Sequence, residues 1–244
     1  MPDSSDDDRL PQGLPPEDHF DEDVSSQLPS SEDAAISRRN LPEPAVGRLS
    51  LYYRELFRLR DSGTTSINSR ELGKLVNVSP AVVRRDLSAL GTIGRRGVGY
   101  TIDLLIEAIG RLLGSGVQWQ VILVGVGSLG DALLRYRGFE RLGFRLVAAF
   151  DVDPRRIGTS IGGVRVRDAN DLKQALVEFT PDLAILAVPA EKAADVASDL
   201  VSGGITGILN FAPTTLRLSS AIAVVNVDLA SELQRLAFSV QKKK

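Results

Sequence analysis

Residues 121–130 limit the possible folds of this chain more than any other stretch. They read Val-Ile-Leu-Val-Gly-Val-Gly-Ser-Leu-Gly, an apolar run that leads directly into three spaced glycines. In a Rossmann turn the first glycine permits the tight bend, the second lets a pyrophosphate approach, and the third allows close helix–strand packing. The N–H groups of the following helix can then bind the anion. The sequence therefore predicts a dinucleotide site that includes Gly125, Val126, Gly127, Ser128, Leu129 and Gly130.

The acidic residue expected in such a site follows at the end of the next apolar run. Asp151 stands 21 positions after the third glycine of the turn. A carboxylate at this place accepts hydrogen bonds from the adenosine ribose, which favours NAD over NADP. Arg155 and Arg156 are a counter-signal, because arginine can bind a 2′-phosphate. Asp153 is an alternative ribose ligand, and the sequence does not choose between the two carboxylates.

Strands and helices alternate through the rest of the chain. Apolar strands are expected at 120–124, 145–150, 164–166, 183–188, 207–209 and 223–227, with helices from the glycine turn to about 142 and at 171–179, 191–201 and 229–240. This alternation indicates a doubly wound parallel sheet covered on both faces. Ligands of such sheets bind across the carboxyl ends of the strands. The further cofactor-binding candidates at those ends are Val188, Pro189, Asn210 and Phe211.

Charge is segregated in the first hundred residues. Residues 1–40 carry eleven acidic and three basic side chains and few large apolar ones, so we expect a disordered tail. Residues 41–100 carry ten basic and five acidic side chains. Such an excess favours binding to nucleic acid. A merely arginine-rich surface is the alternative interpretation.

Three helices are expected in this basic block. The first spans about 44–63. The second begins near Asn68, whose side chain can form a capping box with Glu71. After a turn at 76–78, Ser79 caps the third helix. Two short helices joined by a tight turn match a helix-turn-helix, in which the second helix of the pair enters the major groove.

The third helix offers one face to DNA. On a helical wheel, Val83, Leu87 and Leu90 cluster on the side expected to pack inward. The opposite side is small, polar or positive, so the backbone can approach the groove while arginine reaches phosphates or guanine edges. The glycine-rich stretch that follows is typical of a hairpin, or wing, whose arginines reach the backbone or minor groove. The DNA-binding candidates are Ser79, Ala81, Arg84, Arg85, Ser88, Arg95 and Arg96.

Residue counts exclude several chemistries. The chain has no cysteine, and its only histidine is His19 in the acidic tail. Disulfides, thiol redox chemistry and Cys/His zinc sites are therefore excluded, and we expect no metal. A dehydrogenase needs a proton donor or acceptor beside the nicotinamide, and none of the four tyrosines has a lysine four residues later. The sheet is expected to bind a dinucleotide without turning it over.

No membrane partner is expected either. No apolar stretch approaches the roughly 18 residues that a membrane-spanning helix needs. The first thirty residues are acidic and lack the apolar core of a secretory signal, so we expect a cytoplasmic protein.

Several segments between residues 41 and 241 together form a specific pattern. They are Val78-Ser-Pro-Ala-Val-Val-Arg-Arg-Asp-Leu87, Gly94-Arg-Arg-Gly-Val-Gly-Tyr100, the turn at 125–130, Phe150-Asp-Val-Asp-Pro154, Ile208-Leu-Asn-Phe-Ala-Pro213, Val227-Asp-Leu-Ala and Leu236-Ala-Phe. The pattern resembles the Rex family of bacterial redox-sensing transcriptional repressors. This resemblance implies a homodimer that binds palindromic operators of respiratory and fermentative genes when NAD+ dominates. It also implies release from DNA when NADH binds between the subunits.

The resemblance assigns roles to individual residues. Arg84 and Arg85 would lie on the recognition helix. Arg54, Tyr136 and Asp228 would form an interdomain switch, in which a carboxylate exchanges phenol and guanidinium partners. Ordinary surface pairing of Tyr136 and Asp228 is the alternative. The last helix would be swapped onto the partner subunit.

The expected fold is α/β, with an N-terminal winged-helix (helix-turn-helix) domain and a C-terminal Rossmann-like doubly wound parallel sheet. The expected boundaries are 1–40 for the disordered acidic tail, 41–102 for the winged-helix domain, 103–118 for a connecting helix and linker, 119–228 for the Rossmann domain, and 229–244 for the C-terminal helix and basic tail. Two other functions stay open. One is an NAD-dependent oxidoreductase with a regulatory N-terminal domain, and the other is an NAD-binding scaffold that touches no DNA.

Overall fold

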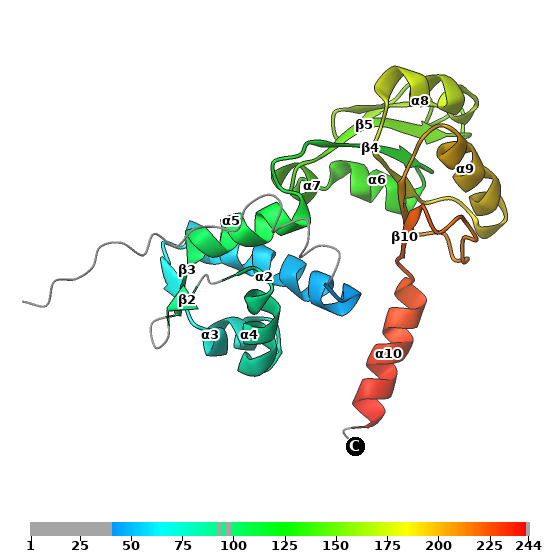
Figure 1. The fold of residues 1–244 in the computed structure, drawn as a ribbon. Coiled ribbons are helices and arrows are strands. Elements are labelled where there is room, and N and C mark those ends of the chain that lie inside the picture. The colour runs from blue at the N-terminus through cyan, green and yellow to red at the C-terminus, as the bar shows by residue number, and fades with distance from the viewer. Residues whose placement is uncertain (1–40, 92–93, 96–98, 243–244) are drawn as a thin grey trace, which may run out of the picture. The chain divides into compact units, whose positions relative to one another are not determined.

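The computed structural model describes residues 41–91, 94–95 and 99–242, which divide into two compact units between Leu113 and Gly114 (Figure 1). The expected acidic tail over 1–40, Arg96, the side chain of Arg95, and the last two residues of the expected basic tail lie outside the described residues. In the described part, no helix combines the length and apolar character that crossing a membrane requires.

The N-terminal unit combines helices with a small antiparallel sheet. Its elements are α2 (Glu43–Asp61), β1 (Ser66–Ile67), α3 (Ser69–Leu75), α4 (Pro80–Ser88), β2 (Gly94–Arg95), β3 (Gly99–Thr101) and α5 (Ile102–Leu113). The sheet has the order β1-β3-β2. Because β2 and β3 pair antiparallel, the hairpin predicted from the glycine-rich stretch is confirmed.

Side-chain caps fix where the two short helices begin. The Asn68 side chain accepts hydrogen bonds from the N–H groups of Arg70 and Glu71, both at 3.0 Å. Glu71 in turn accepts from the Asn68 N–H, which completes the predicted capping box. Ser79 Oγ accepts from the Val82 N–H at 3.3 Å and starts α4. The helix-turn-helix therefore has the boundaries that its polar residues predict.

Helix α5 belongs to the N-terminal unit, whereas 103–118 was expected to be a connecting helix and linker between the two domains. Ile102, Leu105 and Ile109 are almost fully buried, and they pack with residues of α2 and α4 in one core. An amphipathic helix of this kind is stabilised only where its apolar stripe meets another apolar surface. The helix therefore completes the N-terminal unit, and the chain passes to the second unit at Gly114.

The C-terminal unit is an alternation of strands and helices. Its elements are β4 (Trp119–Val124), α6 (Ser128–Arg135), α7 (Gly138–Arg141), β5 (Phe144–Asp151), β6 (Ser160–Ile161), β7 (Val164–Asp168), the 3-10 turn η1 (Ala169–Asp171), α8 (Leu172–Phe179), β8 (Leu183–Leu186), α9 (Ala190–Ser202), β9 (Gly207–Asn210), β10 (Ala223–Asn226) and α10 (Leu229–Gln241). The single helix expected from the glycine turn to 142 is two helices, because Tyr136 adopts an extended conformation after α6.

The sheet has the order β10-β9-β8-β4-β5-β7-β6. All neighbours pair in parallel except β6, a short edge strand that the sequence pattern did not predict. Without that edge strand, the order reverses at β4 as it does in a dinucleotide-binding Rossmann sheet. The carboxyl end of β4 is therefore the topological switch point, where such sheets bind their ligands.

Helices cover the two faces of this sheet unequally. One face packs α8 and α9 against alternate residues of β4, β5 and β8. The opposite face carries α6 and α7, whose Leu134 and Phe139 pack near β4. Beyond α7 an apolar groove of about 390 Å³ remains, lined by residues of β4, β5, β8, β9 and β10. The sequence predicts helices on both faces of the sheet. On the face that carries α6 and α7, the part beyond α7 has no helix of the same chain over it among the described residues, so the prediction is wrong there.

Helix α10 is exposed along its whole length in the described part of the chain. None of its residues is buried. Leu229, Leu233, Leu236 and Val240 form one stripe, and each is more than half exposed. Four large apolar side chains left in water on one helix face indicate a surface that another apolar surface covers.

Candidate dinucleotide site and nucleic-acid interface

The glycine turn has the geometry that its spacing predicts. Gly125 has a φ of +99°, and a Cβ there would meet the carbonyl oxygen of Ala187. A Cβ at Gly130 would meet the carbonyl oxygen of Gly125. These two positions therefore require glycine because of close backbone packing. Gly127, by contrast, has no atom within 4 Å of the place a Cβ would take. It is also the N-cap of α6, where no side chain caps the helix.

Three residues of the turn contribute differently to the site. Val126 is fully buried, and its N–H donates to Asp151. Ser128 and Leu129 are exposed in the first turn of α6. The start of α6 therefore presents backbone N–H groups and an open surface beside Gly127, which suits a phosphate.

Asp151 lies directly against this turn. Its Oδ2 accepts a hydrogen bond from the Val126 N–H at 2.6 Å, and its Oδ1 accepts from the Asp153 N–H at 2.8 Å. Each carboxylate oxygen can accept more than one hydrogen bond, so both retain capacity for a ribose hydroxyl. The carboxylate is half-buried at the end of β5, next to the position where the pyrophosphate of a dinucleotide would bind.

The two arginines that raised the question of NADP are both paired with carboxylates. Arg155 donates to both oxygens of Asp153, at 2.9–3.1 Å, and this contact lowers the pKa of the Asp153 carboxyl. Arg156 donates to Asp131 on α6 at 3.0 Å. A hydrogen bond from Arg135 is the main cause that lowers the pKa of the Asp131 carboxyl, and the bond from Arg156 lowers it further. Asp153 is thus occupied by its own loop, whereas Asp151 faces the glycine turn.

The remaining candidates follow the carboxyl ends of neighbouring strands. In the sheet register, Val124 lies beside Phe150 and Leu186, and Leu186 lies beside Asn210. The glycine turn, Asp151, Val188, Pro189 and Phe211 therefore all follow the same edge of the sheet. Val188 and Phe211 are half-buried and Pro189 is exposed.

Asn210 is held by hydrogen bonds within its own unit. It is 1% exposed, and its side-chain amide donates to the Thr214 carbonyl at 2.8 Å and to Asn226 at 2.9 Å. Its Oδ1 accepts from the Ala212 N–H. The Asn210 side chain thus holds the loop after β9 and joins it to Asn226 at the end of β10.

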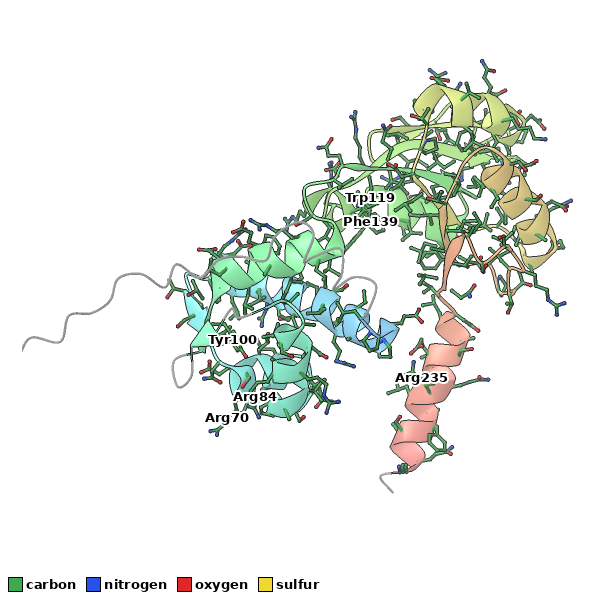
Figure 2. All side chains as sticks on the ribbon, in the orientation of Figure 1. Arg70, Arg84, Tyr100, Trp119, Phe139 and Arg235 are labelled. Carbon is green, nitrogen blue, oxygen red and sulfur yellow. The ribbon has the colours of Figure 1, made fainter. Side chains whose placement is uncertain are left out.

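Helix α4 presents the face that the helical wheel predicts. Ser79, Ala81, Arg84, Arg85 and Ser88 are exposed, whereas Val83 and Leu87 are buried. Arg84 donates to Ser69 on α3 at 3.2 Å, and its charge acts on the phenol of Tyr100 in β3, beside which Figure 2 places it. Burial is the larger effect on that phenol and raises its pKa.

Two sets of residues in this unit were not among the residues predicted from the sequence. Arg70 and Lys74 are exposed on α3, and their charge was the available signal. Asp86 is 3% exposed on the inward side of α4, where Arg48 and Tyr52 of α2 bond it. An acidic residue among inward-facing apolar ones was the signal for these contacts.

Of the three candidate switch residues, Tyr136 and Asp228 lie in the C-terminal unit and Arg54 lies in the N-terminal unit. Tyr136 is 58% exposed, and its ring makes an edge contact with Phe139. Asp228 caps α10 by accepting from Ala230 and Ser231, contacts that lower the pKa of its carboxyl. Within the described part of the C-terminal unit, no hydrogen bond joins Tyr136 to Asp228. Arg54 lies on α2 of the N-terminal unit, 3.4 Å from Glu55.

A helix-turn-helix unit with a wing and a Rossmann-like sheet place this chain in the class of proteins that join an N-terminal DNA-binding helical domain to a dinucleotide-binding fold. Two family descriptions support this class. "Putative DNA-binding protein N-terminus" matches residues 40–88, and "CoA binding domain" matches residues 117–214.

The similar proteins define the family more narrowly. The redox-sensing transcriptional repressor Rex of Rhodopirellula baltica is 63% identical over 86% of this chain and 89% of its own length. Rex of Streptomyces coelicolor is 41% identical over 86% of this chain and 81% of its own length. This chain belongs to the Rex family of redox-sensing transcriptional repressors.

Solved structures agree with this assignment. The structure of RSP in complex with β-NAD+ and operator DNA is 31% identical, covers 83% of this chain and 94% of its own, and has a TM-score of 0.76. The structure of RSP in complex with β-NADH is 30% identical, covers 84% of this chain and 96% of its own, and has a TM-score of 0.75. The family is one of repressors and not of enzymes.

Proposed function

We propose that this chain is an NADH-responsive repressor that binds palindromic operators of respiratory and fermentative genes and leaves them when NADH binds. One observation carries the proposal: an open glycine turn with Asp151 beside it and an outward basic face on α4 belong to the same chain. Both halves have counterparts in RSP, which has been solved with β-NAD+ and operator DNA and with β-NADH. A repressor of this kind would act in the cytoplasm, where the operator DNA is.

The chain's own residues would bind the dinucleotide at the switch point of the sheet. The Gly127 backbone and the start of α6 would hold the pyrophosphate, and Asp151 would accept the ribose hydroxyls. Arg155 and Arg156 are neutralised by carboxylates, which favours NAD over NADP. Phe211 and the segment 188–189 would border the ligand along the same edge.

The apolar stripe of α10 supports a homodimer. A palindromic operator has two half-sites, and a two-fold symmetric dimer matches them. In the dimer, α10 would be swapped onto the partner subunit, where its four apolar side chains leave water. Arg54, Tyr136 and Asp228 would then meet across subunits or domains and change partners between the two states.

The response to NADH follows from differential affinity. A ligand shifts an equilibrium only by as much as it prefers one state over the other. NADH must therefore bind more tightly to an arrangement in which the two α4 helices cannot reach both half-sites. By linkage, operator DNA lowers the affinity for NADH by the same factor.

The deciding experiment is a titration of the protein on DNA. An inverted-repeat duplex, selected from a random library in the presence of NAD+, is labelled, and its fluorescence anisotropy with the protein is measured while NADH or NAD+ is added. We expect release by NADH at concentrations where NAD+ has little effect. Sustained NADH oxidation with a substrate panel would instead favour the oxidoreductase. Failure to bind any duplex at low salt, where phosphate contacts are strongest, would remove the repressor function.

Arg85 on the recognition helix is expected to read the operator. Replacing it with alanine should weaken operator binding about 5- to 150-fold, because a good arginine contact to a base contributes about 1–3 kcal/mol. NADH affinity should stay unchanged. Arg58→Ala is the matched control, since Arg58 is 67% exposed on α2 and pairs with Glu55. Equal operator affinity of the Arg85 variant and the control would show that α4 does not read the DNA.

A further inference from the structure

A polar cluster joins helix α2 to the recognition helix α4, with Asp86 and Tyr52 buried and the Arg48 side chain 28% exposed. The Asp86 carboxylate, 2% exposed, accepts from Arg48 Nε at 2.7 Å and from Arg48 Nη2 at 2.8 Å. It also accepts from the Tyr52 hydroxyl at 2.9 Å. Arg48 and Tyr52 stand one turn apart on α2, and 38 and 34 residues separate them from Asp86. Arg48, Tyr52 and Asp86 together form the Asp86 cluster.

From these contacts we infer that the Asp86 cluster sets the rotation of α4 about its axis and thereby the specificity of operator recognition, which rests on the proposed function. Asp86 immediately follows Arg84 and Arg85 in the helix. Any rotation of α4 that changes the bonds of Asp86 on the inward side therefore moves both arginines on the outward side by the same angle.

The magnitudes favour this role. A helix with its side chains is about 10–12 Å across, so rotating it by about 20° moves its surface groups by about 2 Å. Hydrogen bonds to base edges tolerate a spread of only about 0.5 Å. Small errors in the rotation of α4 would thus abolish base contacts while leaving the positive charge near the phosphates.

The apolar contacts of α4 cannot set this angle as sharply. Val83 and Leu87 bury α4 in the N-terminal core, but apolar burial is nondirectional. Arg48 instead binds Asp86 with two parallel bonds, a geometry that fixes both distance and angle. Burial, followed by the bond to Asp86, raises the pKa of the Tyr52 hydroxyl, so Tyr52 remains a donor at neutral pH.

The cluster is expected to contribute less to folding stability than to the orientation of α4. Replacing a buried ion pair by apolar groups of similar size is often neutral or stabilising, because the charges no longer have to be desolvated. Orientation and stability can therefore be separated. The Asp86 cluster residues are positioning residues, since they act through Arg84 and Arg85.

The test replaces the whole cluster with apolar residues, Arg48→Met, Tyr52→Phe and Asp86→Leu, which leaves the net charge unchanged. Binding is measured to the selected operator and to a scrambled duplex of equal length and composition, with thermal unfolding and NADH affinity measured in parallel. We expect the operator-to-scrambled affinity ratio to fall about 10- to 100-fold. Affinity for the scrambled duplex should stay within about threefold, because the phosphate contacts depend on charge.

A folded triple variant with the wild-type ratio overturns the inference. If the triple variant does not fold, the pair Tyr52→Phe and Tyr53→Phe decides. Both remove one hydroxyl from adjacent positions of α2, but only the Tyr52 hydroxyl bonds Asp86. Tyr52→Phe should lower the ratio about threefold or more, since a hydrogen bond to a charged group contributes more than a neutral one. Equal ratios in the two variants also overturn it. A wild-type protein that does not prefer the operator overturns the proposed function itself.

Discussion

Placing two charges on the apolar stripe of α10, as Leu233→Glu with Leu236→Glu, is expected to convert the proposed dimer to a monomer and to lower affinity for a palindromic operator about 10²- to 10⁴-fold. Both leucines are at least 60% exposed within one chain, and burying each in a dimer would contribute about 1.5–3 kcal/mol. A dimer binds its second half-site at high effective concentration, and a monomer loses that gain. Sedimentation and operator titration measure the two effects.

The control for this variant adds the same charge on the other side of the helix. Gln234→Glu with Gln241→Glu should remain dimeric and bind the operator normally. The thermal stability of the separate Rossmann unit should be similar in both double variants, because no residue of α10 is buried among the described residues. A Leu233, Leu236 variant that stays dimeric with wild-type operator affinity would contradict the role of the stripe.

Gly127→Ala should lower NADH affinity about 10- to 100-fold with little change in folding stability. Gly127 has a φ of −69°, which alanine adopts, and nothing lies within 4 Å of the added Cβ. The methyl group would instead occupy the space where the pyrophosphate approaches, and losing one hydrogen bond to a charged group costs about 1.5–3 kcal/mol. Energy transfer to NADH from Trp119, the sole tryptophan, measures binding.

Two other glycines serve as comparisons for this prediction. Gly130→Ala should destabilise the unit itself, because its Cβ would meet the Gly125 carbonyl oxygen. Gly47→Ala on α2 adds the same methyl group in open space and should leave NADH affinity unchanged. If Gly127→Ala binds NADH as tightly as the wild type, the glycine turn does not hold the pyrophosphate.

Local patterns were sufficient where neighbouring residues alone decide the structure. The capping groups Asn68 and Ser79 start α3 and α4 as predicted, because they bond N–H groups two or three positions away. The wheel positions of Arg84 and Val83 give the outer and inner faces of α4, because helical periodicity is fixed. The spacing of the glycines gives the turn after β4 for the same reason.

The pattern was insufficient where a residue's partner is distant in sequence. Residues 103–118 were expected to connect the two domains, yet α5 packs into the core of the N-terminal unit. Asn210 was expected in the ligand site, yet Thr214 and Asn226 take its amide. The apolar groove beside α7 likewise depends on where α6 and α7 end, and α6 ends where Tyr136 becomes extended.

The sequence by itself therefore determined the fold class, the glycine turn, the acidic residue that follows it, and the basic face of a helix-turn-helix. Each is encoded by spacing along a regular element. Only the tertiary structure decided that Asp151 rather than Asp153 faces the turn, and that Asp86 is bonded by Arg48 and Tyr52. Such pairings depend on which segments meet after folding, and a hydrogen bond forms only between atoms that the whole fold brings to within about 3 Å.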